Sequence, residues 1–121
     1  MSDRGDLAFL HDIVEAISAI SSYIKDVDYL SFLKDGKTHD AVVRNLEIIG
    51  EAAKNIRNPF KKMYPALPWK EMAGVRDKLI HQYFGINYEV VWTIATQDLP
   101  SLQKSLKMIL KELKKKNCNK E

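Results

Sequence analysis

The chain has 121 residues and a mass of 13.9 kDa, a size typical of one domain. Its composition is 45% hydrophobic with only 5 Gly and 4 Pro, so regular structure around a real core should dominate. The single cysteine, Cys118, excludes a disulfide framework and favours a reducing compartment. No apolar stretch approaches the ~20 residues of a membrane span, and the N-terminus is unlike a signal peptide, so we expect a soluble, cytoplasmic protein without a membrane partner.

The net charge of +3 is unevenly distributed along the chain. Residues 104–121 contain seven Lys and two Glu, a local charge of +5, whereas residues 1–103 contain twelve Lys or Arg and fourteen Asp or Glu, a local charge of −2. Residues 1–103 therefore lack the excess of basic residues that is typical of a nucleic-acid-binding surface. We interpret the Lys residues as the solvated face of a last helix and a frayed end, with a domain at 1–113 and a basic tail at 114–121.

Apolar residues recur at intervals of three and four, which predicts helices rather than strands. A first helix carries an apolar stripe over residues 7–24, and Ser2 or Asp3 marks its start. A short second helix over 29–33 is capped by Asp28 and ended by Gly36.

A third helix is expected over residues 40–56, where the small residues Gly50, Ala52 and Ala53 would let another helix approach closely. Asn58-Pro59 stops this helix, because the residue before proline avoids helical backbone. Residues 59–68 then form a partly ordered connector. Its side chains expected to pack down are Phe60, Met63, Tyr64 and Leu67.

A fourth helix is predicted over residues 69–83, with Gly85 closing it. Asn87 can cap a fifth helix and Asp98 a sixth, whose apolar stripe extends to Leu113. These elements predict an all-α, up-and-down bundle of four to six helices that dimerises.

The fourth of these helices contains the residue types that RNA cleavage needs. On a continuous helix Arg76 and Tyr83 lie within roughly 20° of each other, while His81 lies about 140° from Arg76. Asp77 and His81, four residues apart, would share a face, so the carboxylate could fix the imidazole tautomer. A histidine can move protons at neutral pH and an arginine can bind phosphate. One His cannot easily serve both ends of an in-line displacement, which favours a composite site across a dimer.

The spacing of Arg76 and His81 is weak evidence alone, because a helical Arg is more often a surface residue and a lone His a bystander. Glu47 and Glu51 are explained by helix solvation, although a role at a dimer cleft stays open. The residues interpreted as solvent-facing are His11, Asp12, His39 and Asp40, and those assigned to the core or dimer interface are Trp69 and Trp92. No Gly-rich phosphate loop, zinc spacing or Ser triad occurs, so we expect neither cofactor nor metal.

Several blocks of sequence, in one order and spacing, resemble the HepT-like family of HEPN ribonuclease toxins. They are the run from Asp40 to Lys54, Pro65-x-x-Pro68-Trp69, Gly74 to Asp77, His81-x-Tyr83-Phe84 and Asp98-Leu99-Pro100-x-Leu102. The resemblance covers about residues 7–113. It implies a dimerising helical bundle with the active cleft at the interface.

The family's Arg-x4-His-x-Tyr motif corresponds to Arg76, His81 and Tyr83. The position after the Arg commonly holds Asn and here holds Asp77, a mild departure that leaves open whether Asp77 orients His81 or repels phosphate. The resemblance implies a metal-independent endoribonuclease toxin of a type VII-like toxin–antitoxin system. Arg76 would stabilise the scissile phosphate, His81 would act as general acid or base, and Tyr83 would position RNA.

The resemblance also implies a partner, a minimal nucleotidyltransferase that serves as antitoxin and adds AMP to Tyr83. The assembly it implies is a homodimer or a larger hetero-assembly with this antitoxin. Added bulk and negative charge beside the cleft would exclude RNA. The alternative is a non-catalytic HEPN subunit that binds nucleotide or serves as a scaffold for the nucleotidyltransferase. The intact set of Arg76, His81 and Tyr83 favours the enzyme.

Overall fold

The computed structural model describes residues 5–81 and 85–119, and the side chains of residues 5–80 and 85–115. The predicted all-α bundle is confirmed. In chain order its elements are α1 (Asp6–Ile24), α2 (Tyr29–Lys34), α3 (Gly36–Asn55), α4 (Asn58–Met63), α5 (Trp69–Ala73), α6 (Val75–Leu79), β1 (Ile80–His81), β2 (Gly85–Ile86), α7 (Tyr88–Thr93), the π-helical segment η1 (Ile94–Asp98) and α8 (Leu99–Asn119).

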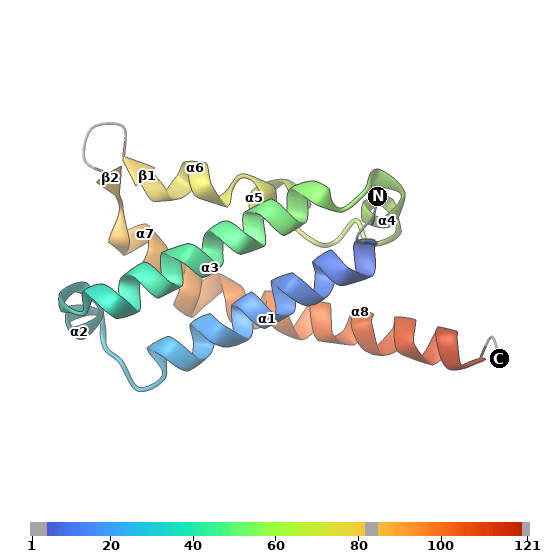
Figure 1. Ribbon diagram of the computed structural model, residues 1–121, viewed down its shortest axis with the longest axis horizontal. Coiled ribbons are helices and arrows are strands. Elements are labelled where there is room, and N and C mark those ends of the chain that lie inside the picture. Colours follow the sequence, from blue (N-terminus) through green and yellow to red (C-terminus); the bar gives the residue numbers. More distant parts are fainter. Residues whose placement is uncertain (1–4, 82–84, 120–121) are drawn as a thin grey trace.

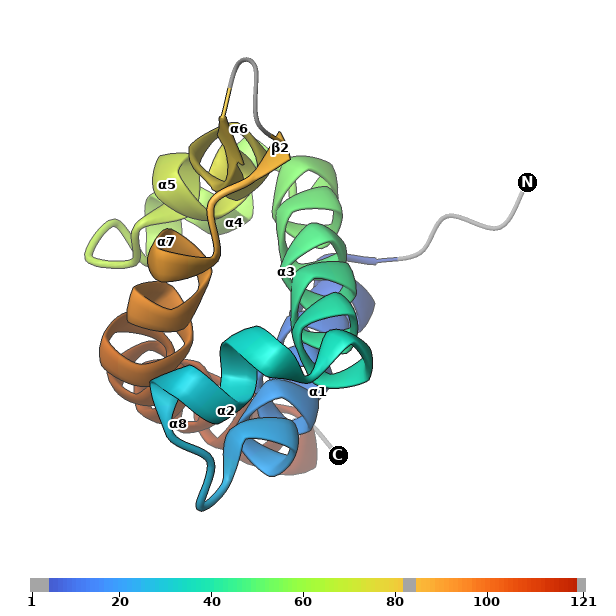
Figure 2. The same ribbon diagram turned by 90° about the vertical axis from the view of Figure 1, so that its left-hand side faces the viewer.

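Helices α1 and α3 run antiparallel side by side and form the centre of the bundle (Figure 1). Helices α5 and α6 follow α3 along one side, and α7, η1 and α8 close the opposite side, so that the helices surround a common interior (Figure 2). The short pair of strands β1 and β2 projects from the end of the bundle where α6 leads into α7 (Figure 1).

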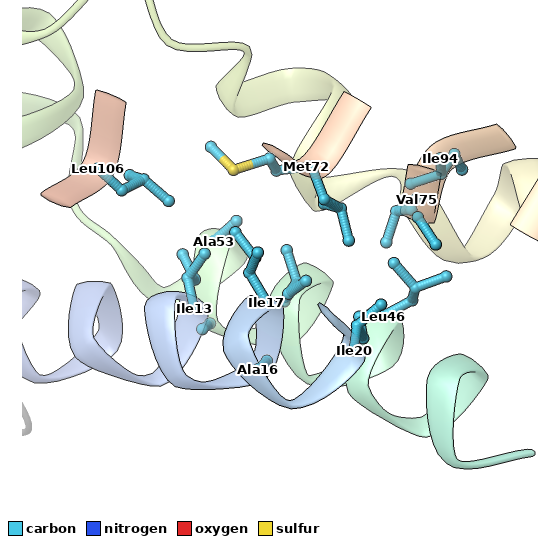
Figure 3. Packing of buried hydrophobic residues seen from close by; sticks show 14 of the residues in the cluster. Ile13, Ala16, Ile17, Ile20, Leu46, Ala53, Met72, Val75, Ile94 and Leu106 are labelled. Carbon is cyan, nitrogen blue, oxygen red and sulfur yellow. The ribbon is translucent and has the colours of Figure 1, made fainter. Parts of the chain in front are cut away.

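The core follows the apolar stripe predicted for the first helix. The fully buried residues of α1 point at Leu46 of α3 and at Met72 and Val75 of α5 and α6 (Figure 3). These α1 residues are Leu10, Ile13, Ile17 and Ile20. Burying a side chain of this size contributes roughly 1.5–3 kcal/mol, so the stripe is a major source of stability.

Helix α1 is also more apolar than the sequence analysis allowed. Its 19 residues include a window with a mean hydropathy of 1.3, so by length and composition it could cross a membrane. In the folded chain its buried residues pack against α3 and α8, which gives this apolar composition a role in the core.

The expected close approach of a helix to the small residues of α3 is confirmed. A Cβ atom placed on Gly50 would lie 3.2 Å from Cγ1 of Val75 and 3.3 Å from the carbonyl oxygen of Met72. Such distances are tighter than most real Cβ contacts, so a side chain at this position would displace its neighbours by a few tenths of an ångström. Gly50 therefore sets how closely α5 and α6 pack on α3.

Two helix starts differ from the prediction. Helix α3 begins at Gly36 rather than near residue 40, because Asp35 caps it by accepting hydrogen bonds from Thr38 N (3.2 Å) and Thr38 Oγ1 (2.6 Å). Helix α1 begins at Asp6, and the caps proposed for it, Ser2 and Asp3, lie outside the described residues.

The expected connector at 59–68 is partly helical, since α4 occupies Asn58–Met63 with Pro59 in its first turn. Leu67 is buried as expected, and Phe60 and Tyr64 are half-buried, but Met63 is 57% exposed. The expectation that Met63 packs down was therefore wrong.

The prediction that Asp98 caps a separate sixth helix was also wrong. The chain stays helical from α7 through η1 into α8, and Asp98 is the last residue of η1. Helix α8 continues to Asn119, so most of the basic tail expected after residue 113 has helical backbone. Asn87, in contrast, caps α7 as predicted, accepting from Val90 N at 3.3 Å.

Candidate active site

The segment that carries the motif is not the single helix predicted over residues 69–83. Helix α5 ends at Ala73, Gly74 donates its N–H to Lys70 O at 3.0 Å, and α6 then runs only from Val75 to Leu79. Ile80 has extended backbone (φ −98, ψ 121). The motif therefore spans a helix end and the start of a hairpin.

Pairing between β1 and β2 explains why α6 stops. Ile80 lies opposite Ile86 and His81 opposite Gly85, and Asn87 N donates to Leu79 O at 2.7 Å. Gly85 has a φ of +82, which glycine adopts without strain. Gly85 thus belongs to this hairpin and does not end a long helix.

This geometry removes the helical relations inferred from the sequence. Asp77 and His81 do not share a helix face, because the helix ends between them, and the angles of His81 and Tyr83 relative to Arg76 no longer apply. Asp77 is exposed, and within the described part of the chain its carboxylate makes no hydrogen bond or ion pair. Tyr83 and the side chain of His81 lie outside the described residues.

Arg76 projects from a well-anchored element. Its helix is held by Val75 and Leu79, which are buried, with Val75 packed on Gly50 of α3. Arg76 itself is exposed. An exposed cation on a packed helix end can bind a phosphate, and the backbone of His81 follows it by five residues.

His39 was interpreted as a surface residue, which the structure corrects. Its ring centroid lies 4.2 Å from that of Tyr88 and 6.1 Å from that of Phe32, and its side chain is 15% exposed. Nδ1 lies 3.0 Å from Oδ1 of Asp40. This packing supports the start of α7, directly after the hairpin. The signal in the sequence was the three-residue spacing from His39 to the buried Val42, which is informative only once the helix begins at Gly36.

Of the two tryptophans, which were assigned to the core or the dimer interface, Trp69 is a core residue. It is 8% exposed, and its indole N–H donates to Tyr64 O at 2.9 Å. Trp92 is half-buried, with its ring 5.0 Å from that of Phe32.

A hollow of about 460 Å³ lies between α5–α6 and η1–α8, with Met72, Val75 and Leu99 among its lining residues. Lys78 lines both this hollow and a second one of about 430 Å³. Lys78 follows Arg76 by two residues, so on α6 their side chains point roughly 160° apart. The hollow therefore faces away from Arg76.

No group of three His, Cys, Asp or Glu side chains that could hold a metal ion occurs within the described part of the chain. The nearest carboxylate in sequence to the motif, Asp77, stands without such neighbours there.

Comparison with known proteins decides the family. The model of a family described as "Ribonuclease HepT-like" matches residues 13–109, a range that includes the whole motif and most of the bundle. The chain belongs to this HepT-like ribonuclease family. The resemblance inferred from the sequence blocks is thereby confirmed.

Relatives within the HepT-like family match along nearly their whole length. A protein of Methanocaldococcus jannaschii named "Putative RNase MJ0127" is 47% identical over 112 residues, 93% of this chain and 93% of that protein. "Probable ribonuclease HepT" of Thermococcus cleftensis is 50% identical over 100 residues, 83% of this chain and 91% of that protein. No solved structure matches the chain.

Proposed function

We propose that this HepT-like ribonuclease is a metal-independent endoribonuclease whose chemistry depends on Arg76 and His81. The observation that carries the proposal is their placement at a packed helix end and the hairpin that follows it, in a chain whose family consists of ribonucleases. Arg76 is exposed, so its guanidinium contributes little to the packing that holds this fold together.

The reaction that these side chains suit is attack by a ribose 2′-OH on the adjacent phosphorus. A base removes the hydroxyl proton, the new O–P bond forms as the bond to the 5′-oxygen breaks, and an acid protonates that oxygen. The products are a 2′,3′-cyclic phosphate and a 5′-hydroxyl. In this scheme His81 transfers protons and Arg76 stabilises the charge that builds on the phosphate oxygens. Asp77 is the candidate to orient His81, through a side-chain movement, because its carboxylate is exposed.

The proposal extends to regulation. The protein would be the toxin of a type VII-like toxin–antitoxin pair in the cytoplasm, acting as a homodimer. A nucleotidyltransferase partner would transfer AMP from ATP to the hydroxyl of Tyr83 with release of pyrophosphate. An adenylyl group next to the hairpin would place a negative charge where the RNA phosphate has to bind.

RNA digestion in the presence of EDTA tests the catalytic proposal. His81→Ala should reduce cleavage by about 100-fold or more, the usual contribution of a general acid or base. Arg76→Ala should lose a similar factor, because charge stabilisation in the transition state is worth roughly 3 kcal/mol. The 2′,3′-cyclic phosphate ends should be visible by mass spectrometry of the products.

Two matched variants control for the loss of a histidine or an arginine outside the proposed site. His11→Ala and Arg44→Ala remove an exposed residue of the same type from other helices and should cleave like the parent. Melting temperatures should agree within a few degrees across the set. Full activity of His81→Ala, or cleavage that EDTA abolishes, would contradict the proposal. Absence of RNA cleavage by the unmodified chain would favour the scaffold alternative.

A further inference from the structure

The lysines of the last helix form one continuous stripe. At 100° per residue, five lysines of α8 fall within an arc of roughly 100° on the face turned away from its apolar residues. We define the lysine stripe by these residues, all of them exposed: Lys104, Lys107, Lys111, Lys114 and Lys115. With a rise of 1.5 Å per residue, the stripe is about 16 Å long.

No carboxylate neutralises the lysine stripe within the part of the chain that the structure describes. The ion pairs of His39 with Asp40 and of Arg57 with Asp6 include no lysine of the stripe, and none of the five lysines has a carboxylate partner among the described side chains. Glu112, the acidic residue within α8, lies outside the arc of the stripe. Five unpaired cations on one helix face produce a positive potential that a solvated surface helix usually limits with interspersed acidic residues.

The C-terminal end of the stripe lies beyond the packed part of α8. Among the described side chains of α8, the last buried one is Ile109 and the last half-buried one is Leu113. The C-terminal part of the helix extends beyond the N-terminal end of α1 (Figure 1). The hairpin of the candidate active site lies at the other end of the bundle (Figure 1). The stripe is therefore separate from the residues assigned to cleavage.

We propose that the lysine stripe, interpreted from the sequence as a solvated helix face, instead binds the phosphate backbone of RNA without reading its sequence. Lysine contacts phosphate as a point charge, and α8 contains no aromatic residue or arginine on which bases could stack. A polyanion with evenly repeated charge fits a stripe of evenly repeated cations better than a folded acidic protein surface does. The inference rests on the proposed function, because it assigns the stripe to the RNA that the site cuts, at a distance from the cut.

The test measures binding of fluorescent single-stranded RNA by anisotropy at a series of salt concentrations, using His81→Ala so that the probe stays intact. The stripe variant replaces four lysines by glutamine, which keeps helix propensity: Lys104, Lys107, Lys111 and Lys114. The matched control replaces four exposed lysines elsewhere, with the same change of charge: Lys25, Lys54, Lys62 and Lys70. The slope of log K against log salt should fall in magnitude by about 2.8 for the stripe variant, since each lost contact to a single strand is worth ~0.7.

At low salt we expect the stripe variant to bind RNA at least ~10-fold more weakly and the control variant to lose much less. In chains that keep His81, the stripe variant should cleave a long RNA with a raised KM and an unchanged kcat. It should cleave a substrate of a few nucleotides with the same KM and kcat as the parent. Equal losses in the two variants, or no loss in either, would overturn the inference. So would unchanged RNA binding with lost affinity for the nucleotidyltransferase, which would assign the stripe to a protein partner.

The same measurements separate this inference from the proposed function. RNA binding that depends on the stripe, in a protein that cuts no RNA, would leave the inference standing and end the proposed function. Cleavage that depends on His81, together with RNA binding that does not change in the stripe variant, would support the proposed function and end this inference.

Discussion

Tyr83 has two proposed roles, one for its aromatic ring and one for its hydroxyl. Its ring would position RNA beside the hairpin, whereas its hydroxyl would accept AMP from the partner enzyme. Tyr83→Phe keeps the ring and its packing and removes the acceptor. The variant should therefore cut RNA at close to the parent rate and should no longer be silenced by the nucleotidyltransferase and ATP.

Two readouts check this prediction on Tyr83→Phe: RNA digestion, and the intact mass of the protein with and without partner and ATP. The parent chain should gain the mass of AMP and lose activity, while the variant should do neither. AMP found on the variant would move the modification to another residue. Reduced cleavage without the partner would show that the hydroxyl also binds RNA or transfers a proton.

His39 shows what a single residue reveals only in three dimensions. Beside Asp40 in the sequence it has the pattern of a solvent-facing pair, yet its ring packs between Phe32 and Tyr88. Tyr88 is 49 positions away, so the contact depends on how α7 returns to α3. The motif residues, by contrast, were recognised from their spacing together with several other blocks of sequence.

The ends of the helices were harder to predict than their existence, and α3 shows the reason. Asp35 caps it five residues before the start predicted from the apolar periodicity, and hydrogen bonds from Thr38 hold the pKa of Asp35 below its ordinary value of 3.8. A lowered pKa in the folded state means that the ionised cap stabilises the fold above pH 3.8. That contribution is lost as the pH falls through the lower pKa of the folded state.

We predict that Asp35→Ala lowers the melting temperature at pH 7 and that the gap to the parent narrows as the pH falls below 3.8. Asp35→Asn is the control, because it retains an oxygen acceptor for Thr38 N without the titratable charge. It should melt between the two at neutral pH and show a flatter dependence on pH. A gap between parent and Asp35→Ala that stays constant down to strongly acidic pH would show that the charge of the cap is irrelevant.

The predicted fourth helix failed for a different physical reason. Residues 69–83 have helical periodicity, but Gly74 lies between α5 and α6 and the segment after Leu79 pairs with a strand formed by Gly85 and Ile86. Local propensity is a weak guide where such pairing competes with it. The cluster of β-branched and aromatic residues around Gly85 was a hairpin signal that helical spacing concealed. The long stripes of α1 and α8 have no such competitor, and their apolar periodicity was predicted correctly although the ends of α8 were not.

At the scale of the whole molecule, the dimer stays a prediction whose support has changed. The angle between Arg76 and His81 on a straight helix no longer supports it, because that helix ends at Leu79. Two points still favour pairing: one imidazole cannot easily serve as both base and acid, and Ile80, directly before His81, is 44% exposed. An exposed apolar side chain beside His81, the proposed catalytic residue, is what a partner surface would cover.

Light scattering of the unmodified chain should give a mass near twice 13.9 kDa. A monomer mass would contradict the dimer.

Mixing two inactive variants tests whether both chains contribute residues to one site. If Arg76 of one chain acts with His81 of the other, dimers of Arg76→Ala with His81→Ala retain one intact pair of residues. Unfolding and refolding the two variants together should pair them randomly, so about half of the dimers would be mixed and cleavage should return. Each variant refolded alone should stay inactive, and the parent refolded the same way gives the reference rate. The mixture should cut no more RNA than the separate variants do in two cases: if Arg76 and His81 of the same chain act together, because every chain lacks one of them, or if one cleft needs the imidazoles of both chains, because each mixed dimer holds a single His81.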